Sequence, residues 1–142
     1  MDPAKIVEAA IDTWNGKDEQ AFVELFRPDA EITGPGGTVL QGTEGARMFW
    51  QGYQGAFPDN QVVVRTVFGA GDQAVEEAAF EGTHTAPLVG ADGTEVPPTG
   101  RRVSVPFTAV YGLRDGRVAT FHLYFDQVEM LTQLGLMPES AS

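Results

Sequence analysis

The segment R-V-A-T-F-H-L-Y-F-D-Q, residues 117–127, decides how this chain folds, because its pattern predicts one long strand with two chemically different faces. Side chains alternate between the faces of a strand. One face of this strand is apolar and the other is polar: Phe121, Leu123 and Phe125 against His122, Tyr124 and Asp126. A shift of one residue exchanges the inward and outward faces. The interior is therefore either hydrophobic or lined by a His-Tyr-Asp array, and we expect the hydrophobic arrangement.

The rest of the chain predicts helices followed by a meander of strands. Helices are expected over 3–14, 18–26 and 43–57, with Asp2 and Thr43 as caps, and short strands over 30–33 and 38–41. Four β-rich runs follow at 61–68, 73–84, 102–113 and 117–126, and then a last helix over 127–134. Residues 87–100 are rich in Gly and Pro. This order predicts a single α+β domain, residues 1–142, whose strongly curved, mainly antiparallel sheet wraps around the helices.

Charge and composition exclude several classes of partner. Nine Lys and Arg residues against 20 Asp and Glu residues give a net charge of −11, which repels nucleic acids and anionic membranes. The chain contains no cysteine, and its two histidines, His84 and His122, lie far apart in the sequence, so we expect no metal site. No apolar run is long enough for a signal or a membrane span, so we expect a cytoplasmic protein.

Several motifs together resemble one known family. They are F-R-P-D-A at 26–30, G-T-H-T-A-P-L-V-G at 82–90, P-P-T-G-R-R at 97–102, R-D-G-R-V at 114–118 and F-D-Q-V-E-M-L-T-Q-L-G-L-M-P at 125–138. In order and spacing they resemble the SnoaL-like polyketide cyclase/ester cyclase branch of the NTF2-like superfamily. The resemblance implies a conical α+β fold with a deep pocket, usually in a homodimer. It also implies ring closure by intramolecular aldol chemistry without metal or organic cofactor.

The chain departs from this family at the positions that carry catalysis. The family's catalytic aspartate lies three residues before an aspartate at the strand end, which matches Asp126, so its position falls on Leu123. By the same resemblance, supporting polar positions fall on Ala109, with Phe107 beside it, and on Ile32. Leucine can neither accept nor donate the proton that aldol chemistry requires.

An apolar pocket is the corresponding expectation. Its predicted lining is Trp14, Phe26, Ile32, Met48, Tyr53, Phe107, Ala109, Tyr111, Phe121, Leu123 and Phe125. Such a pocket suits a small hydrophobic or aromatic ligand, since buried apolar surface contributes roughly 25 cal/mol per Å². Tyr53 and Tyr111 could each donate a hydrogen bond to a ligand carbonyl. The alternative is that these residues simply fill a core.

Two residues are candidates for the acid–base group. His84 has an ordinary pKa of about 6.5 that allows both roles, although it could instead hold residues 87–100 by hydrogen bonds. Glu76 faces inward if Ala78 and Phe80 do, whereas its neighbour Glu77 then faces outward. The alternative is that both glutamates are solvated or paired with Arg65 or Arg102. Asp126 is expected to cap the last helix.

Two functions follow from these expectations. The first is a cofactor-independent cyclase or isomerase of polyketide-type metabolism that uses His84, Glu76 or a tyrosine. The second is a non-catalytic protein that binds or shields a hydrophobic ligand in the same pocket. A third, the Asp-Arg-Asp epoxide hydrolase type of this superfamily, lacks a visible array in the sequence.

Overall fold

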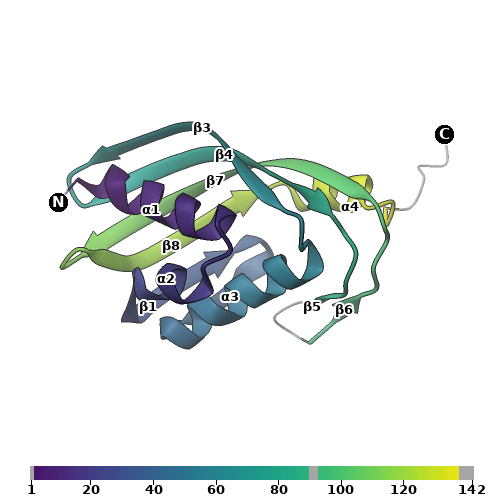
Figure 1. Ribbon diagram of the computed structural model, residues 1–142, viewed down its shortest axis with the longest axis horizontal. Coiled ribbons are helices and arrows are strands. Elements are labelled where there is room, and N and C mark those ends of the chain that lie inside the picture. The colour runs from purple at the N-terminus through teal and green to yellow at the C-terminus, as the bar shows by residue number, and fades with distance from the viewer. Residues whose placement is uncertain (1, 90–92, 138–142) are drawn as a thin grey trace.

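The computed structural model describes residues 2–89 and 93–137 (Figure 1). The first half contains three helices: α1 Pro3–Asn15, α2 Glu19–Glu24 and α3 Gly42–Ala56. Between α2 and α3 lie two strands, β1 Phe26–Gly34 and β2 Thr38–Gln41, which are joined by the short 3-10 helix η1 Pro35–Gly37. Within the described ranges, no helix is long and apolar enough to cross a lipid bilayer.

The second half supplies the long strands. They are β3 Gln61–Ala70, β4 Gln73–Thr83, β7 Arg102–Arg114 and β8 Arg117–Phe125, followed by helix α4 Gln127–Gln133. With β1 and β2 they form one sheet in the order β2-β1-β8-β7-β4-β3, in which only the β1–β8 pair is parallel. A separate small hairpin, β5 Leu88–Val89 and β6 Glu95–Val96, lies between β4 and β7 in the sequence and outside the large sheet.

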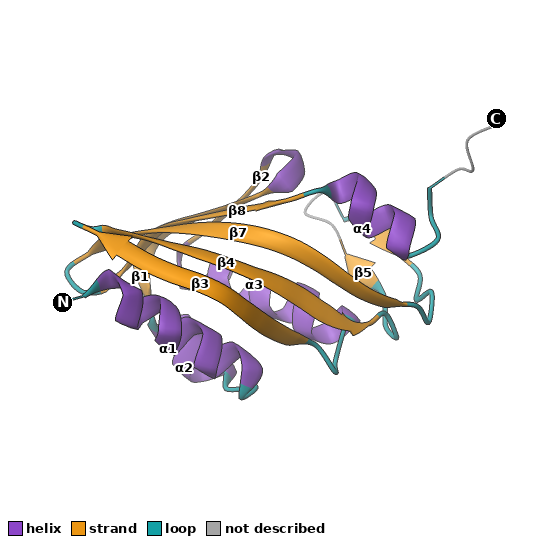
Figure 2. Ribbon diagram, turned by 90° about the horizontal axis from the view of Figure 1, so that it is seen from above, coloured by secondary structure: helices purple, strands orange, loops and turns teal. Residues whose placement is uncertain are grey.

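The sheet curves around the helices on one side. Figure 2 shows α1, α2 and α3 on the same side of the sheet, with α4 at one end. The core lies between these layers and is aromatic: Trp14 of α1 packs against Phe22 of α2 and Trp50 of α3 at ring distances of 5.4 and 5.1 Å. This arrangement confirms the predicted α+β class.

Local signals explain where most elements begin and turn. The Asp2 carboxylate accepts a hydrogen bond from the Ala4 amide (3.0 Å) and starts α1, as predicted. Asp126 does the same for α4, accepting from the amides of Val128 (2.9 Å) and Glu129 (3.2 Å). This confirms its predicted capping role.

Strand β8 has the predicted orientation. Phe121 and Leu123 are 5% and 8% exposed, whereas Tyr124 on the other face is 58% exposed. The register pairs Tyr111 with Phe121 and Ala109 with Leu123, so the inward faces of β7 and β8 coincide. The His-Tyr-Asp alternative for the interior is therefore wrong.

Three local predictions were wrong: the end of the second helix, the start of the strand after it and the cap of α3. The second helix ends at Glu24, and the chain enters β1 at Phe26, so the helix expected to reach residue 26 is shorter and the strand longer. Thr43 does not cap α3, because the helix begins at Gly42 after Gln41 and has no side-chain cap. Gly42 takes φ = 72° and approaches the Pro28 carbonyl so closely that a Cβ would lie 2.8 Å from its oxygen.

Candidate functional site

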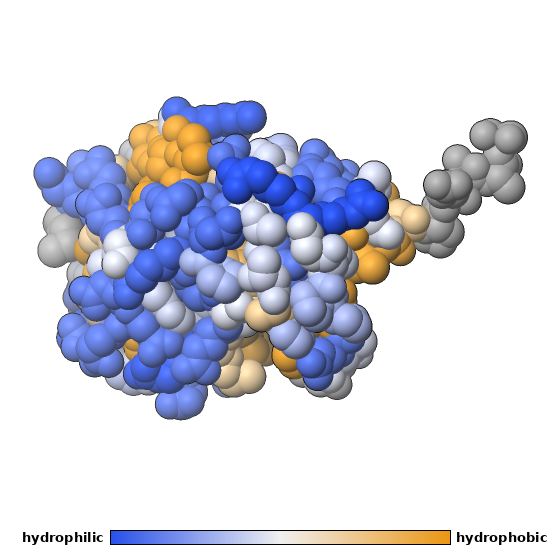
Figure 3. Space-filling view, turned by 45° about the vertical axis from the view of Figure 1, so that its right-hand side comes forward, coloured by the Kyte–Doolittle hydropathy of each residue, from blue (hydrophilic) through white to orange (hydrophobic). Residues whose placement is uncertain are grey.

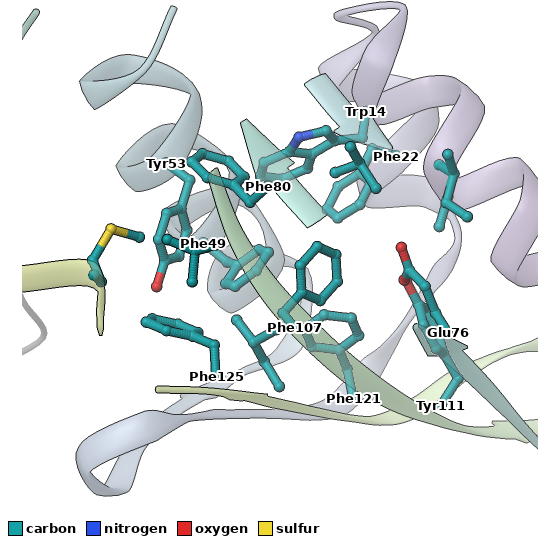
Figure 4. A pocket seen from close by; sticks show the side chains of 16 residues that line it. Trp14, Phe22, Phe49, Tyr53, Glu76, Phe80, Phe107, Tyr111, Phe121 and Phe125 are labelled. Atoms are coloured by element: carbon teal, nitrogen blue, oxygen red, sulfur yellow. The ribbon is translucent and has the colours of Figure 1, made fainter. Parts of the chain in front are cut away.

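An aromatic cavity lies inside the curve of the sheet (Figure 4). Its free volume is about 70 Å³, which is well below the roughly 300–1,000 Å³ of typical ligand pockets. We call it the inner chamber. Its lining is hydrophobic apart from a few polar groups: Ala10, Ile11, Trp14, Phe22, Phe49, Tyr53, Val62, Glu76, Phe80, Val105, Phe107, Tyr111, Phe121, Leu123, Phe125 and Met130.

A buried carboxyl group marks one end of the inner chamber. Glu76 of β4 is 3% exposed, and its Oε1 accepts a hydrogen bond from the Tyr111 hydroxyl of β7 at 3.0 Å. Adjacent strands bring the two residues together, because Glu76 pairs with Ala109 and Tyr111 lies two residues further along the same face. Neither Arg65 nor Arg102 contacts Glu76, so the solvated or ion-paired alternative is wrong for this residue, while Glu77 is exposed.

The surroundings of this pair change the acidity of both groups. Burial raises the pKa of Glu76 to about 7, although the hydrogen bond from Tyr111 acts in the opposite direction. Burial, followed by the charge of Glu76 and the hydrogen bond to it, raises the pKa of Tyr111 well above its ordinary value. Tyr111 therefore remains a neutral donor, and Glu76 can both hold and release a proton near neutral pH.

A second and larger cavity adjoins the first. This outer chamber has a volume of about 590 Å³ and lies between α3, α4, the β1–β2 connection and the β5–β6 hairpin. The two chambers share five lining residues: Phe49, Tyr53, Leu123, Phe125 and Met130. The outer chamber therefore adjoins the inner chamber at the end away from Glu76, and Figure 4 shows Glu76 and Tyr53 at opposite ends of the aromatic cluster.

Close aromatic packing separates the two ends. The ring of Phe121 lies 5.0 Å from Tyr111 and 5.3 Å from Phe49, in edge-to-face geometry. Phe107 lies between these ends in the same view (Figure 4). In this arrangement the outer chamber has ligand size, whereas the space beside Glu76 is narrow.

The structure divides the predicted pocket residues into three groups. The inner chamber contains Trp14, Tyr53, Phe107, Tyr111, Phe121, Leu123 and Phe125, and the outer chamber contains Ile32, Met48, Tyr53, Leu123 and Phe125. Two others, Phe26 and Ala109, line neither chamber. Phe26 is 1% exposed because it packs against Phe22 and Phe121, and Ala109 is enclosed within the sheet between Glu76 and Leu123.

His84 lies outside both chambers. It is fully buried, and its ring stacks on Phe57 at 5.2 Å. Its Nδ1 accepts from the Thr99 amide (3.2 Å) and lies 3.1 Å from the Thr99 hydroxyl, while its backbone pairs with Gly100 and Arg101. Burial lowers the pKa of His84, partly opposed by the backbone of Ala86. His84 therefore holds together the two chain segments from which the β5–β6 hairpin extends. This is the structural role that the sequence offered as the alternative to acid–base catalysis.

Sequence reasoning missed several lining residues. Phe49 and Phe80 both line the inner chamber, and Leu88, Val89 and Val96 reach the outer chamber from the β5–β6 hairpin. The signal for Phe49 was its spacing of four residues from Tyr53 on one helix, and for Phe80 its alternation with Glu76. The hairpin residues had no such signal, since their segment is short and rich in Gly and Pro.

No group of metal-ligating side chains occurs among the described residues. Among the described residues, Glu76 is the only carboxyl group in the lining of either chamber, and neither lining contains a described Lys, Arg or His. The arrangement thus offers one proton acceptor, tyrosine hydroxyls and hydrophobic surface. These are the components of acid–base chemistry on a neutral organic molecule.

Comparison with known proteins identifies the family. The model of the SnoaL-like polyketide cyclase family matches residues 4–134, which is most of the chain. The chain belongs to the SnoaL-like polyketide cyclase family. No curated protein sequence matches it at a significant level.

Solved structures agree with this assignment. A proposed SnoaL-like polyketide cyclase from Jannaschia sp. CCS1 is 27% identical, with 96% of this chain and 93% of that one aligned at a TM-score of 0.83. IdmH, a proposed polyketide cyclase from Streptomyces antibioticus, is 32% identical over 94% and 98% of the chains at a TM-score of 0.75. A protein with a ketosteroid isomerase-like fold from Catenulispora acidiphila is 20% identical over 94% of each chain, at 0.76. The family and NTF2-like fold that the motifs indicated are confirmed.

Proposed function

We propose that this SnoaL-like protein is a cofactor-independent cyclase or isomerase of polyketide-type small-molecule metabolism, in which Glu76 is the acid–base group. The observation that carries the proposal is the buried Glu76–Tyr111 pair at the end of an aromatic cavity. A desolvated carboxyl group with a pKa near 7 is suited to taking a proton from a carbon acid and returning it. The family position at Leu123 has no such ability.

The proposed reaction begins with proton abstraction next to a ligand carbonyl. Tyr111 holds Oε1 of Glu76, and within the described residues Oε2 makes no hydrogen bond, so Oε2 would accept the proton. The electrons of the C–H bond then form an enolate. In a cyclisation, the enolate carbon attacks a second carbonyl carbon of the same molecule, and the resulting alkoxide takes a proton back from Glu76. In an isomerisation, the proton returns to another carbon.

The sizes of the chambers decide which part of a ligand could react. About 70 Å³ beside Glu76 accommodates only a small group, while about 590 Å³ in the outer chamber accommodates the body of a polycyclic molecule. We therefore propose that the ligand body occupies the outer chamber and that only its reacting end passes between the aromatic rings. Holding the reacting atoms together in this way would itself lower the barrier.

Deuterium exchange into 2-tetralone in D₂O, followed by NMR, tests the proposed chemistry without a known substrate. This neutral bicyclic ketone has acidic C–H bonds next to its carbonyl. We expect the protein to accelerate exchange, with a rate that rises through a midpoint near pH 7, and Glu76→Gln to lower the protein-dependent rate at least 100-fold. Glu77→Gln, on the exposed face of the same strand, is the control and should leave the rate unchanged.

Tyr111→Phe supplies a second test of the same pair. Removing the hydroxyl takes away the hydrogen bond that lowers the pKa of Glu76, so the midpoint of exchange should move to higher pH by about half to one unit. An exchange rate that is indifferent to both Glu76→Gln and Tyr111→Phe would refute the assignment.

The second candidate function is non-catalytic binding of a hydrophobic ligand. The narrow space beside Glu76 favours it, because the aromatic rings there are already closely packed. In that case 2-tetralone would bind without any acceleration of exchange. The epoxide hydrolase alternative has less support, since the described lining of the two chambers contains no arginine and no second carboxyl group.

A homodimer and a cytoplasmic location also remain proposals. The outward face of the sheet presents large apolar side chains, among them Val63 and Phe68 of β3 and Tyr124 of β8, at 48%, 56% and 58% exposure. A second copy of the chain would cover this face, as family resemblance implies.

A further inference from the structure

The hydroxyl of Tyr53 lies where the two chambers meet. Tyr53 is on α3 and belongs to the lining of both cavities. Figure 4 shows its hydroxyl directed toward Phe125, at the end of the aromatic cluster that is remote from Glu76 and Tyr111. The reacting end of a ligand whose body occupies the outer chamber would therefore pass this hydroxyl on the way to Glu76.

This hydroxyl has no partner within the described part of the protein. No hydrogen bond joins it to another described residue, in contrast to the Tyr111 hydroxyl, which is held by Glu76. It also retains accessible surface, since His84 Nε2 is the only fully enclosed side-chain nitrogen or oxygen without a partner in the described ranges. A hydroxyl group that faces a hydrophobic cavity without a protein acceptor is available to a ligand.

The ring that carries the hydroxyl is held in place. Its neighbours are Phe49, one turn earlier on α3 at 5.2 Å, and Phe80 of β4 at 5.9 Å. Burial raises the pKa of Tyr53 to about 12, so the phenol stays protonated. A fixed, neutral donor loses little rotational freedom when it forms a hydrogen bond, which favours specificity.

The rest of the lining determines the chemistry of the matching ligand. Neither chamber has a Lys, Arg or His in the part of its lining that the structure describes, so a carboxylate or phosphate that entered would lose its hydration without gaining a counter-charge. The outer chamber otherwise offers aliphatic and aromatic surface with a few neutral polar groups, such as Gln51 and Gln127. A flat, uncharged ring system with an oxygen acceptor on its body satisfies both conditions.

We infer that Tyr53 is the specificity-determining donor of this site, and that it selects uncharged cyclic ligands whose body carries a carbonyl or other neutral oxygen acceptor remote from the reacting carbon. The inference rests on the proposed function for the location of the reacting end. The donor role itself requires only that the outer chamber binds the ligand body.

Binding of a matched pair of probes tests this role. The probes are 6-methoxy-2-tetralone and 6-ethyl-2-tetralone, which share the reacting ketone and the ring skeleton and differ in one oxygen acceptor remote from that ketone, and their affinities are measured by NMR titration. The measurements use the Glu76→Gln protein, in which exchange chemistry does not interfere. We expect Tyr53→Phe to weaken 6-methoxy-2-tetralone binding about three- to ten-fold and to change 6-ethyl-2-tetralone binding less than two-fold.

Controls separate the hydrogen bond from packing. Tyr124→Phe removes a hydroxyl on the outer face of the sheet and should leave both affinities unchanged. An anionic probe, 2-naphthoate, should bind at least ten-fold more weakly than neutral 2-naphthaldehyde, because the lining offers it no counter-charge.

Each other outcome overturns the inference. Equal losses for both tetralone probes would show that Tyr53 acts through packing, and no loss for either, or no binding by either, would show that its hydroxyl selects no ligand. Naphthoate binding as tight as naphthaldehyde binding would overturn the restriction to uncharged ligands. Failure of the Glu76→Gln exchange test with intact Tyr53 selectivity would instead refute the proposed catalysis and leave the donor role standing.

Discussion

Glu76 combines two properties that rarely occur together in one residue of a stable protein. It is ionisable, yet it is 3% exposed and has a single hydrogen-bonding partner, Tyr111. An apolar residue at this position would extend the hydrophobic lining of the inner chamber without the cost of burying a charge. A buried carboxyl group with a strongly shifted pKa is therefore a sign of function at this site rather than of folding.

The stability of the protein should reveal this cost directly. Because the pKa of Glu76 is about 7 in the folded state and 4.5 in the reference state, the folded protein binds the proton more tightly. The stabilising effect is fully present below pH 4.5, is lost as the pH rises from 4.5 to 7, and is absent above pH 7. Glu76→Gln stays neutral throughout this range. The unfolding free energy of the variant minus that of wild type should therefore be about 3 kcal/mol larger at pH 8 than at pH 4.5.

Urea denaturation at a series of pH values measures this difference. Glu77→Gln is the control, since its carboxyl group is exposed and its substitution should leave the pH dependence of the unfolding free energy as it is in wild type. Parallel curves for wild type and Glu76→Gln across this range would contradict a raised pKa.

At the scale of elements, the sequence predicted which face of β4 and of β8 points inward, but it did not predict the path of the segment that carries the β5–β6 hairpin. Alternation along 117–126 placed Phe121 and Leu123 inside, and alternation along β4 placed Glu76 on the same side as Phe80. The turn at 114–116 was also readable, because Asp115 and Gly116 tolerate the positive φ angles of 54° and 76° that a tight hairpin requires. These are local properties of the chain.

The path of residues 85–89 and 93–101 depends on contacts between residues that are distant in the sequence. The hairpin strands β5 and β6 have two residues each and carry no periodic pattern. Their position is fixed by His84, whose ring and backbone hold Thr99, Gly100 and Arg101 across the base of the excursion. Sequence identified His84 as a polar residue with two possible roles, but only the fold shows which neighbours it has.

His84→Ala separates the two roles of this residue. The change removes a fully buried ring and its hydrogen bond to the Thr99 amide, so we expect the free energy of unfolding to fall by about 2–4 kcal/mol. At a temperature where the variant is folded, the pH midpoint of 2-tetralone exchange should stay near 7, because His84 lines neither chamber. Thr99→Val, which removes only the hydroxyl partner, is the milder control. A variant of unchanged stability that loses exchange would instead make His84 the acid–base group.

At the scale of the whole molecule, apolar surface remains uncovered. Figure 3 shows hydrophobic patches within a mostly hydrophilic surface. Among the exposed hydrophobic residues are the neighbours Leu136 and Met137, which follow α4 and are 43% and 38% exposed. A different patch follows from the strand register, which places Phe68, Val75 and Val110 in one row on the outward face of the sheet. Tyr124 lies on the same face, in the neighbouring row with Thr108.

We expect this sheet face to form a homodimer. Phe68→Arg places a charge within the proposed contact, where it would be desolvated without a partner, so it should raise the dissociation constant of the dimer at least 100-fold. Met137→Arg, which changes the other exposed patch by the same chemistry, is the matched control and should leave the association unchanged. Light scattering coupled to size exclusion, over a range of protein concentrations, measures both.

The charge of the molecule adds a condition to this association. Each copy carries a net charge of −11, so two copies repel one another at a range set by the ionic strength. The screening length falls from about 30 Å at 0.01 M salt to about 3 Å at 1 M. A dimer held by apolar strand faces should therefore become tighter as salt is added, whereas a dimer held by ion pairs would become weaker. A wild-type protein that stays monomeric at every concentration and salt level would refute the dimer, and weakening by salt would place the contact elsewhere on the surface.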